Sequence, residues 1–215
     1  MIRALVFDFD GLILDTETPL IEAWLQLHAR AGLPCSPEAA LQLIGQVDHD
    51  HDLWQAFNAD IDRCELEAEY HQLSRELLQS HAILPGVTNL LTEATRRGLP
   101  LAIASNSHHR SIDRHLARLG LTELFRVVRC RDDVARGKPE PDIYLNVLAA
   151  LGVEGREAIA FEDSHAGSLA AKRAGLHCVA VPNACTLQHD FAHADLRLAS
   201  LADLSLDALL AKWAG

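Results

Sequence analysis

Two features are absent from this sequence of 215 residues: a cluster of lysine and arginine, and an apolar run long enough to cross a bilayer. Acidic residues outnumber basic ones by 30 to 19, so the formal net charge is -11. Nucleic acids and anionic membranes attract basic patches, and a membrane-spanning helix needs about 20 mostly apolar residues. We therefore expect neither nucleic acid nor a membrane as partner, and a small anionic substrate would need local positive charge.

The sequence also has no C-x-x-C pair. Its cysteines are odd in number, and they are Cys35, Cys64, Cys130, Cys178 and Cys185. This pattern suits a reducing compartment rather than a disulfide framework. Met1-Ile2-Arg3 leads directly into a strand-like segment without a signal-peptide pattern. We therefore expect a cytoplasmic protein in which Cys130 and Cys178 are buried strand thiols.

From residue 84 onward, short apolar strands alternate with helices. Hydrophobic residues make up 49% of the chain, enough for a sizeable core. The alternation is typical of a right-handed parallel α/β sheet. The expected strands cover residues 101–104, 127–130, 158–161 and 177–181, and a last helix is expected over 204–213. The apolar run Ile2 to Phe7 resembles these strands and predicts a first member of the same sheet.

A helical block without strands separates that first strand from the others. One expected helix contains Trp24 and closes at Gly32, and a second begins with Ser36 and Pro37 and reaches Gly45. Further helices are expected around residues 53–57 and 66–77. We therefore predict a discontinuous α/β core of residues 1–15 and 83–215 with an inserted four-helix domain of residues 16–82.

Two carboxylates one residue apart, Asp8 and Asp10, stand where the first strand gives way to Gly11. In open α/β sheets this strand end is where ligands bind. Like charges this close resist joint ionisation unless a proton or a divalent cation relieves them. The pair therefore indicates a raised pKa or a metal site, and an acidic strand end entering a glycine turn is the other interpretation.

Polar residues also follow three other segments of the expected sheet. Ser105 and Asn106 come after the strand 101–104, where they could face a phosphate at a helix N-terminus or simply cap the helix. Lys138 lies in Gly-Lys-Pro-Glu-Pro, a stiffened loop that aims its ammonium, although a solvated lysine is the alternative. Glu162 and Asp163 end the strand 158–161, and two adjacent acids suit a hard cation.

Taken together and in this order, these segments resemble the haloacid dehalogenase-like superfamily, specifically its phosphatases with a helical cap and the related β-phosphoglucomutases. The resemblance rests on Asp8-Phe9-Asp10-Gly11 with Asp15-Thr16, on Ser105-Asn106, on Lys138-Pro139 and on Glu162-Asp163-Ser164. It covers nearly the whole chain. It implies a Rossmann-like parallel-sheet core, with the four-helix insertion as the cap that closes over the substrate.

The resemblance also implies a mechanism for hydrolysis of a small phosphorylated metabolite. Asp8 would be the nucleophile that forms an aspartyl-phosphate, and Asp10 the acid/base. Mg2+ would bind Asp8, the backbone carbonyl of Asp10 and Asp163, with Glu162 nearby. Lys138, Ser105 and Asn106 would hold the phosphate oxygens. A monomer is expected because the cap must move.

Two departures from the β-phosphoglucomutase pattern favour water as the acceptor. Those mutases usually carry a histidine four residues after the threonine of the first motif, where this chain has Leu20. They also carry an arginine shortly after a cap glycine, whereas Gly45 is followed here by Gln46, Val47 and Asp48. A mutase remains the alternative to a phosphatase.

Three other interpretations fit the sequence less well. The dehalogenase branch lacks the aspartate that this chain has at position 10, and a two-component receiver domain is near half this length and has no helical insertion after its first strand. The run Asp48-His49-Asp50-His51-Asp52 resembles a metal site. Extended alternation would place its two residue types on opposite faces, so acidic residues leading into a helix are the simpler interpretation.

Overall fold

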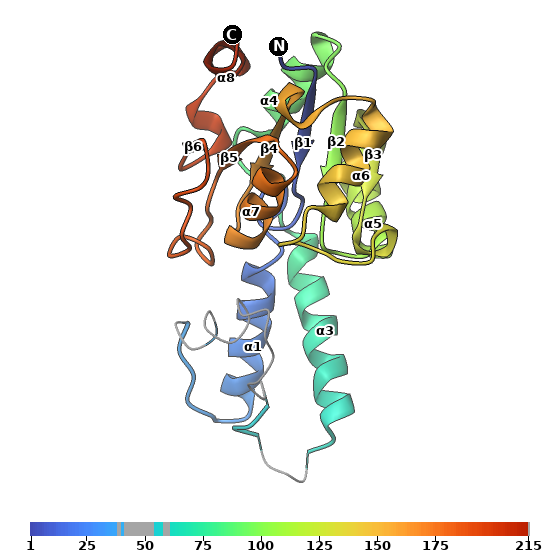
Figure 1. The fold of residues 1–215 in the computed structure, drawn as a ribbon. Coiled ribbons are helices and arrows are strands. Elements are labelled where there is room, and N and C mark those ends of the chain that lie inside the picture. The colour runs from blue at the N-terminus through green and yellow to red at the C-terminus, as the bar shows by residue number, and fades with distance from the viewer. Residues whose placement is uncertain (38–39, 41–53, 58–60, 215) are drawn as a thin grey trace. The chain divides into compact units, whose positions relative to one another are not determined.

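A parallel β-sheet forms the centre of the larger part of the chain (Figure 1). The computed structural model describes residues 1–37, 40, 54–57 and 61–214. Among these, six strands lie in the order β3-β2-β1-β4-β5-β6, and every neighbouring pair is parallel. The strands are β1 (Ala4–Phe7), β2 (Leu101–Ala104), β3 (Phe125–Arg129), β4 (Ala158–Glu162), β5 (His177–Ala180) and β6 (Leu196–Arg197).

The expected α/β class and parallel sheet are confirmed, with one additional strand. The five expected strands agree with β1 to β5 to within two residues at each end. The prediction missed β6, because its two residues, Leu196 and Arg197, are too few to show a hydrophobic period. This strand pairs with β5 at the edge of the sheet.

The strand order places a topological switch point between β1 and β4. After β1 the chain builds outward through β2 to β3, and it then returns to the other side of β1 with β4. Crevices at such points, outside the carboxyl ends of the strands, are where doubly wound sheets bind ligands. Asp8 follows β1 directly and Glu162 ends β4, so both acids lie at this position.

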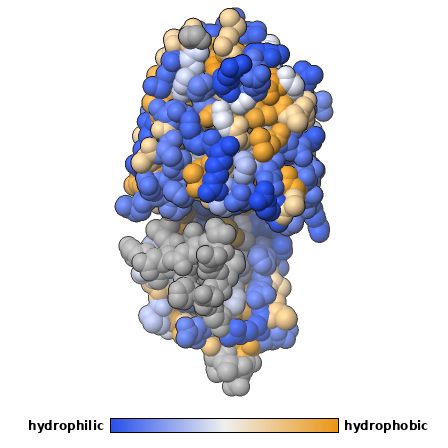
Figure 2. Space-filling view, in the orientation of Figure 1, coloured by the Kyte–Doolittle hydropathy of each residue, from blue (hydrophilic) through white to orange (hydrophobic). Residues whose placement is uncertain are grey.

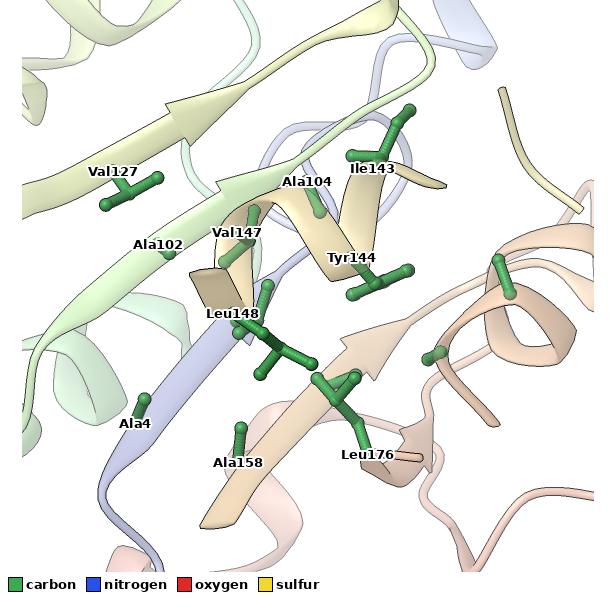
Figure 3. Packing of buried hydrophobic residues seen from close by; sticks show 14 of the residues in the cluster. Ala4, Ala102, Ala104, Val127, Ile143, Tyr144, Val147, Leu148, Ala158 and Leu176 are labelled. Carbon is green, nitrogen blue, oxygen red and sulfur yellow. The ribbon is translucent and has the colours of Figure 1, made fainter. Parts of the chain in front are cut away.

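Helices follow the strands and bury both faces of the sheet. They are α4 (Val87–Arg96), α5 (His109–Leu119), α6 (Asp142–Leu151), α7 (His165–Arg173) and α8 (Leu206–Lys212). On one face, Ala4 and Val6 of β1 pack with residues of α6 and α7 (Figure 3). Because successive strand residues point to opposite faces, Leu5 and Phe7 lie on the other face, where both are fully buried.

The chain divides into two compact units, residues 1–14 with 83–215 and residues 15–82. At their junction in the sequence, the two crossing segments meet in an antiparallel bridge between Leu14 and Ile83. Hydrophilic residues cover most of the core unit on the face seen in Figure 2. No helix among the described residues is long and apolar enough to span a membrane.

The unit of residues 15–82 contains α1 (Thr18–Arg30) and α3 (Arg63–Gln79), which pack against each other. The carboxylate of Asp15 accepts a hydrogen bond from the backbone N–H of Thr18, the first residue of α1. The second expected helix, over 36–45, falls largely outside the described residues. Of the third, residues 54–57 form a turn and a bend, so the count of four helices stays a prediction.

An aromatic cluster with a buried histidine at its centre stabilises this unit. His28 is 1% exposed, and its ring lies against Trp24 and edge-on to Phe57. Its Nδ1 bonds the carbonyl of Trp24, whereas Nε2 has no hydrogen-bond partner among the described residues. Burial lowers the pKa of His28, since a charged ring would lie in apolar surroundings.

We predict that protonation of His28 lowers the free energy of unfolding at mildly acidic pH. The folded state favours the neutral ring, so this contribution is fully present above the ordinary pKa of 6.5 and is lost as the pH falls below that value through the lowered pKa of the folded state. The His28→Phe variant keeps an aromatic ring but cannot titrate. Urea unfolding followed by circular dichroism at about pH 8 and about pH 5 should show a smaller loss of stability in the variant. Equal losses in both proteins would contradict the prediction.

Candidate active site

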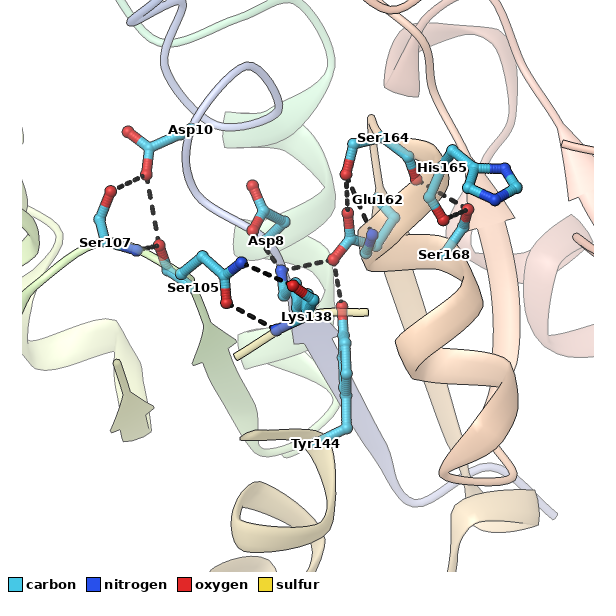
Figure 4. A network of polar contacts seen from close by, with 12 residues as sticks. Asp8, Asp10, Ser105, Ser107, Lys138, Tyr144, Glu162, Ser164, His165 and Ser168 are labelled. Carbon is cyan, nitrogen blue, oxygen red and sulfur yellow. Dashed lines mark hydrogen bonds and ion pairs between the residues drawn. The ribbon is translucent and has the colours of Figure 1, made fainter. Parts of the chain in front are cut away.

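Four elements bring polar side chains to the carboxyl end of the sheet (Figure 4). Asp8 follows β1, Ser105 follows β2, Glu162 ends β4, and Lys138 lies in the loop before α6. β1 lies between β2 and β4 in the sheet, so three of these segments are direct neighbours. The convergence expected from the sequence therefore follows from the parallel pairing of β1 with both strands.

The centre of the cluster is the ammonium group of Lys138. Its Nζ donates to Oδ1 of Asp8 and to Oε1 of Glu162, each at 2.5 Å. All three side chains are buried. Burial alone would lower the pKa of Lys138, but its ion pairs with Asp8 and Glu162 outweigh this and raise it above the ordinary value. The ammonium is therefore a fixed positive charge at neutral pH.

Asn106 fixes the backbone that carries this lysine. Its side-chain Oδ1 accepts from the backbone N–H of Lys138 at 2.8 Å, and its Nδ2 donates to the carbonyl of the same residue at 3.2 Å. A Cβ atom at Gly137 would lie 2.6 Å from Oδ1 of Asn106, so a glycine is needed beside this contact. The side-chain amide of Asn106, which was expected to bind phosphate, thus hydrogen-bonds the backbone of Lys138.

Three acids lie close enough together to share one cation. Asp8, Glu162 and Asp163 each offer an oxygen, and these oxygens lie within 4.8 Å of one another. Burial raises the pKa of Asp8 and so do the neighbouring charges of Glu162 and Asp10, while Lys138 opposes the shift. Three carboxylates and one ammonium leave two negative charges unbalanced. A set of buried oxygen donors with this charge fits a divalent cation.

Glu162 is held from several sides. Oε1 accepts from the hydroxyl of Tyr144 at 2.6 Å as well as from Lys138. Oε2 accepts a longer bond of 3.4 Å from Ser164. A Cβ atom built on Gly167 would lie 1.9 Å from Oε2, so α7 can approach the carboxylate only with glycine there. Gly167 thus allows close packing of α7 behind the carboxylate.

Asp10 points away from the other acids. Its Oδ2 accepts from the hydroxyl of Ser107 at 2.7 Å and from that of Ser105 at 3.3 Å. Figure 4 shows this carboxylate directed toward the two serines rather than toward Asp8. Phe9, between the two aspartates in sequence, is fully buried. The two acids one residue apart therefore lie in different environments.

Three contributors were not found from the sequence. Ser107 bonds Asp10, Tyr144 bonds Glu162, and the Nδ2 of Asn183 donates to Oδ2 of Asp163 at 2.8 Å and to the carbonyl of Gly11 at 3.2 Å. Gly11 has a φ of +74°, and an added Cβ would lie 2.4 Å from Nδ2 of Asn183. Asn183 lies just beyond β5, at the same edge of the sheet. Its position after an expected strand is the feature of the sequence that could have identified it.

Two histidines follow Ser107 but bond residues outside the acid cluster. His108 pairs with Asp132, and His109 pairs with Asp133. The run 48–52 and the glycine segment 45–48 fall outside the described residues. The part of the chain that the structure describes contains one group of three or more potential metal ligands, the acids named above.

Comparison with known proteins supports the resemblance drawn from the motifs. The family model "Haloacid dehalogenase-like hydrolase" matches residues 5–181. The curated relative "Putative phosphatase YhcW" of Bacillus subtilis is 39% identical over 214 residues, which cover 98% of this chain and 97% of YhcW.

Two solved structures share the fold. CbbY from Rhodobacter sphaeroides in complex with phosphate is 30% identical with a TM-score of 0.78, over 97% of this chain and 99% of CbbY. A "putative beta-phosphoglucomutase from Thermotoga maritima" is 27% identical with a TM-score of 0.82, over 94% and 95% of the two chains. The family match spans every acid and the lysine described above. The chain therefore belongs to the haloacid dehalogenase-like hydrolases.

Proposed function

We propose that this hydrolase is a Mg2+-dependent phosphatase that cleaves a small phosphomonoester through an aspartyl-phosphate on Asp8. The observation that carries the proposal is the pairing of Lys138 with Asp8 beside a second and third buried acid. The names of its relatives agree, since one is named "Putative phosphatase YhcW" and CbbY was solved with phosphate.

Asp8 is proposed as the nucleophile because it is the acid that the ammonium of Lys138 holds at the carboxyl end of β1. Lys138 binds Oδ1 and so fixes the direction of the second carboxylate oxygen. An oxygen of Asp8 would attack phosphorus while the ester oxygen departs. Water would then cleave the acyl phosphate and regenerate the carboxylate.

Asp10 is proposed as the acid/base. It would give a proton to the departing alkoxide and later take one from the attacking water. Ser105 and Ser107 hold its carboxylate through Oδ2, so they set where that proton is delivered.

Mg2+ is proposed as the divalent cation, because carboxylate and carbonyl oxygens are the ligands that this small hard ion prefers. Asp8, Asp163, Glu162 and the backbone carbonyl of Asp10 would hold it. When bound, it offsets the repulsion between an anionic nucleophile and an anionic substrate.

Lys138 and Ser105 are proposed to hold the phosphate oxygens. Lys138 is the cation at the centre of the site, and the hydroxyl of Ser105 lies at the end of the neighbouring strand. Asn106 would contribute by holding the backbone of Lys138, since both polar atoms of its side chain bond that residue. Lys138 and the proposed divalent cation would thus supply the positive charge that phosphate needs in a protein of net negative charge.

The unit of residues 15–82 is proposed as the cap that selects the substrate. It is inserted between β1 and β2, and it is compact in itself. Leu20, at the position where the mutases carry histidine, favours water over a second sugar phosphate as acceptor. Sugar phosphates and nucleotides are both substrates of the proposed size.

We predict that the protein hydrolyses at least one compound of a phosphomonoester panel in the presence of Mg2+. Chelation with EDTA should abolish turnover, because two buried negative charges would then oppose the substrate, and added Mg2+ should restore it. Released inorganic phosphate measures the rate. Full activity after thorough chelation would refute the metal assignment, and an inactive panel would refute the phosphatase.

The same panel separates a phosphatase from a mutase. Glucose 1-phosphate is incubated with and without glucose 1,6-bisphosphate, and glucose 6-phosphate is measured alongside free phosphate. A phosphatase releases phosphate and does not respond to the bisphosphate. Formation of glucose 6-phosphate that depends on the bisphosphate would replace the phosphatase by the mutase alternative.

We predict that Asp8→Asn abolishes turnover and leaves the fold intact. The amide is nearly isosteric with the carboxylate but cannot become an acyl phosphate. Steady-state rates and circular dichroism check both parts. Asp207→Asn is the matched control, since that exposed aspartate lies on α8 and pairs with Arg97. Turnover by Asp8→Asn at the rate of the control would remove Asp8 from the mechanism.

A further inference from the structure

Tyr144 connects the hydrophobic core to the ion pairs of the site. It lies on α6 and is fully buried, in one cluster with Ala104 of β2 and Val147 (Figure 3). From there its hydroxyl reaches Oε1 of Glu162 at 2.6 Å (Figure 4). The ring belongs to the core, and the oxygen belongs to the polar network.

The hydroxyl is not needed for packing. A phenylalanine ring would fill nearly the same volume in the cluster around Val147, whereas a buried hydroxyl costs free energy unless it is hydrogen-bonded. Burial and the adjacent Glu162 and Asp8 raise the pKa of Tyr144, so the group stays protonated and remains a donor. Its acceptor is the carboxylate that also binds Lys138.

Glu162 depends on this bond for its orientation. Oε1 receives Tyr144 and Lys138, and the bond from Ser164 to Oε2 is long at 3.4 Å. Gly167 lies against the carboxylate on one side, and glycine has no side chain that could donate a hydrogen bond. Without the hydroxyl, Lys138 would be the remaining short contact among the described residues. The carboxylate could then change its orientation together with the ammonium of Lys138, and it would no longer hold that ammonium in place.

We propose that Tyr144 is a positioning residue that holds Glu162 so that the ammonium of Lys138 stays between Glu162 and Asp8. The inference rests on the proposed phosphatase function, because it assigns Lys138 and Asp8 a role in turnover. Tyr144 does not contact the reacting atoms. Its ring centroid lies 5.3 Å from Nζ of Lys138, a contact that phenylalanine would keep. The effect of the hydroxyl passes through Glu162 to the lysine, and from the lysine to the nucleophile.

The first test is a double-mutant cycle between Tyr144→Phe and Glu162→Gln. Tyr144→Phe should lower kcat by about tenfold, the size of one hydrogen bond to a charged group, and change KM less than twofold. In the Glu162→Gln background the same change should have no further effect, because the residue through which it acts is altered. Equal losses in both backgrounds, or no loss in either, would overturn the proposal.

The matched control is Tyr70→Phe. The chain has two tyrosines, and Tyr70 is buried on α3 in the unit of residues 15–82. The control removes a hydroxyl from a buried ring and should leave kcat unchanged. Similar losses in both variants would mean that the loss follows from a general loosening of the protein, and would count against Tyr144.

A second readout does not use activity. Calorimetric titration with Mg2+ should give weaker binding for Tyr144→Phe than for the wild type and Tyr70→Phe, because Glu162 lies in the acid cluster. Equal affinities in the three proteins would contradict the proposal. A wild type that binds Mg2+ yet hydrolyses no phosphomonoester would refute the proposed function and leave this comparison to decide on Tyr144.

A third measurement keeps the inference testable if Tyr144→Phe does not fold. Growth of the Tyr70→Phe protein with 3-fluorotyrosine places one fluorine label, at Tyr144. Its 19F resonance should shift when Mg2+ is added, since the ion changes the charge that the hydroxyl meets at Glu162. A resonance that does not move while calorimetry records binding would overturn the proposal.

Discussion

The rest of the site depends on the ion pairs that the buried ammonium of Lys138 forms with Asp8 and Glu162. Two carboxylates, Asp8 and Glu162, come from neighbouring strands, and without a cation between them their burial would be strongly unfavourable. The lysine must therefore reach the end of the sheet on a backbone that does not move. Asn106 supplies that restraint from the end of β2. The ion pairs of Lys138, the contact of Asn106 with its backbone and the pairing of β1 with β4 therefore support one another.

The order of the strands explains why distant parts of the chain can meet there. β1 lies at the centre, and its partners β2 and β4 are brought beside it by the reversal of the sheet. Any polar residue that ends β1, β2 or β4 then projects to the same crevice. The residues 15–82 enter between β1 and β2 without changing this pairing, because the bridge of Leu14 with Ile83 closes the chain before the sheet resumes. The fold can therefore accept an insertion in the sequence shortly after β1.

This topology also sets how much the sequence could predict. Apolar runs interrupted by acids identified Asp8, Glu162 and Asp163, since the change from strand to polar residue is visible in a single sequence. Tyr144 gave no signal, because its ring fits the apolar pattern of α6 and the pattern does not tell where a hydroxyl points. The contacts of Asn106 were also out of reach, since an amide can bind phosphate or backbone equally well by composition. β6 was missed for lack of length.

Asp8 and Asp10 are one residue apart, yet the fold separates what each carboxylate can do. Asp8 lies among charges, beside two further acids and beside Lys138, whose ammonium opposes the rise in the pKa of Asp8 that burial causes. Asp10 is partly exposed and receives hydroxyl groups, from Ser105 and Ser107. Under the proposed mechanism a nucleophile must stay ionised beside a fixed cation, whereas an acid/base must exchange its proton freely. The chain leaves β1 and turns at Phe9, whose carbonyl accepts from the N–H groups of Leu12, Ile13 and Leu14, so the two carboxylates meet different neighbours.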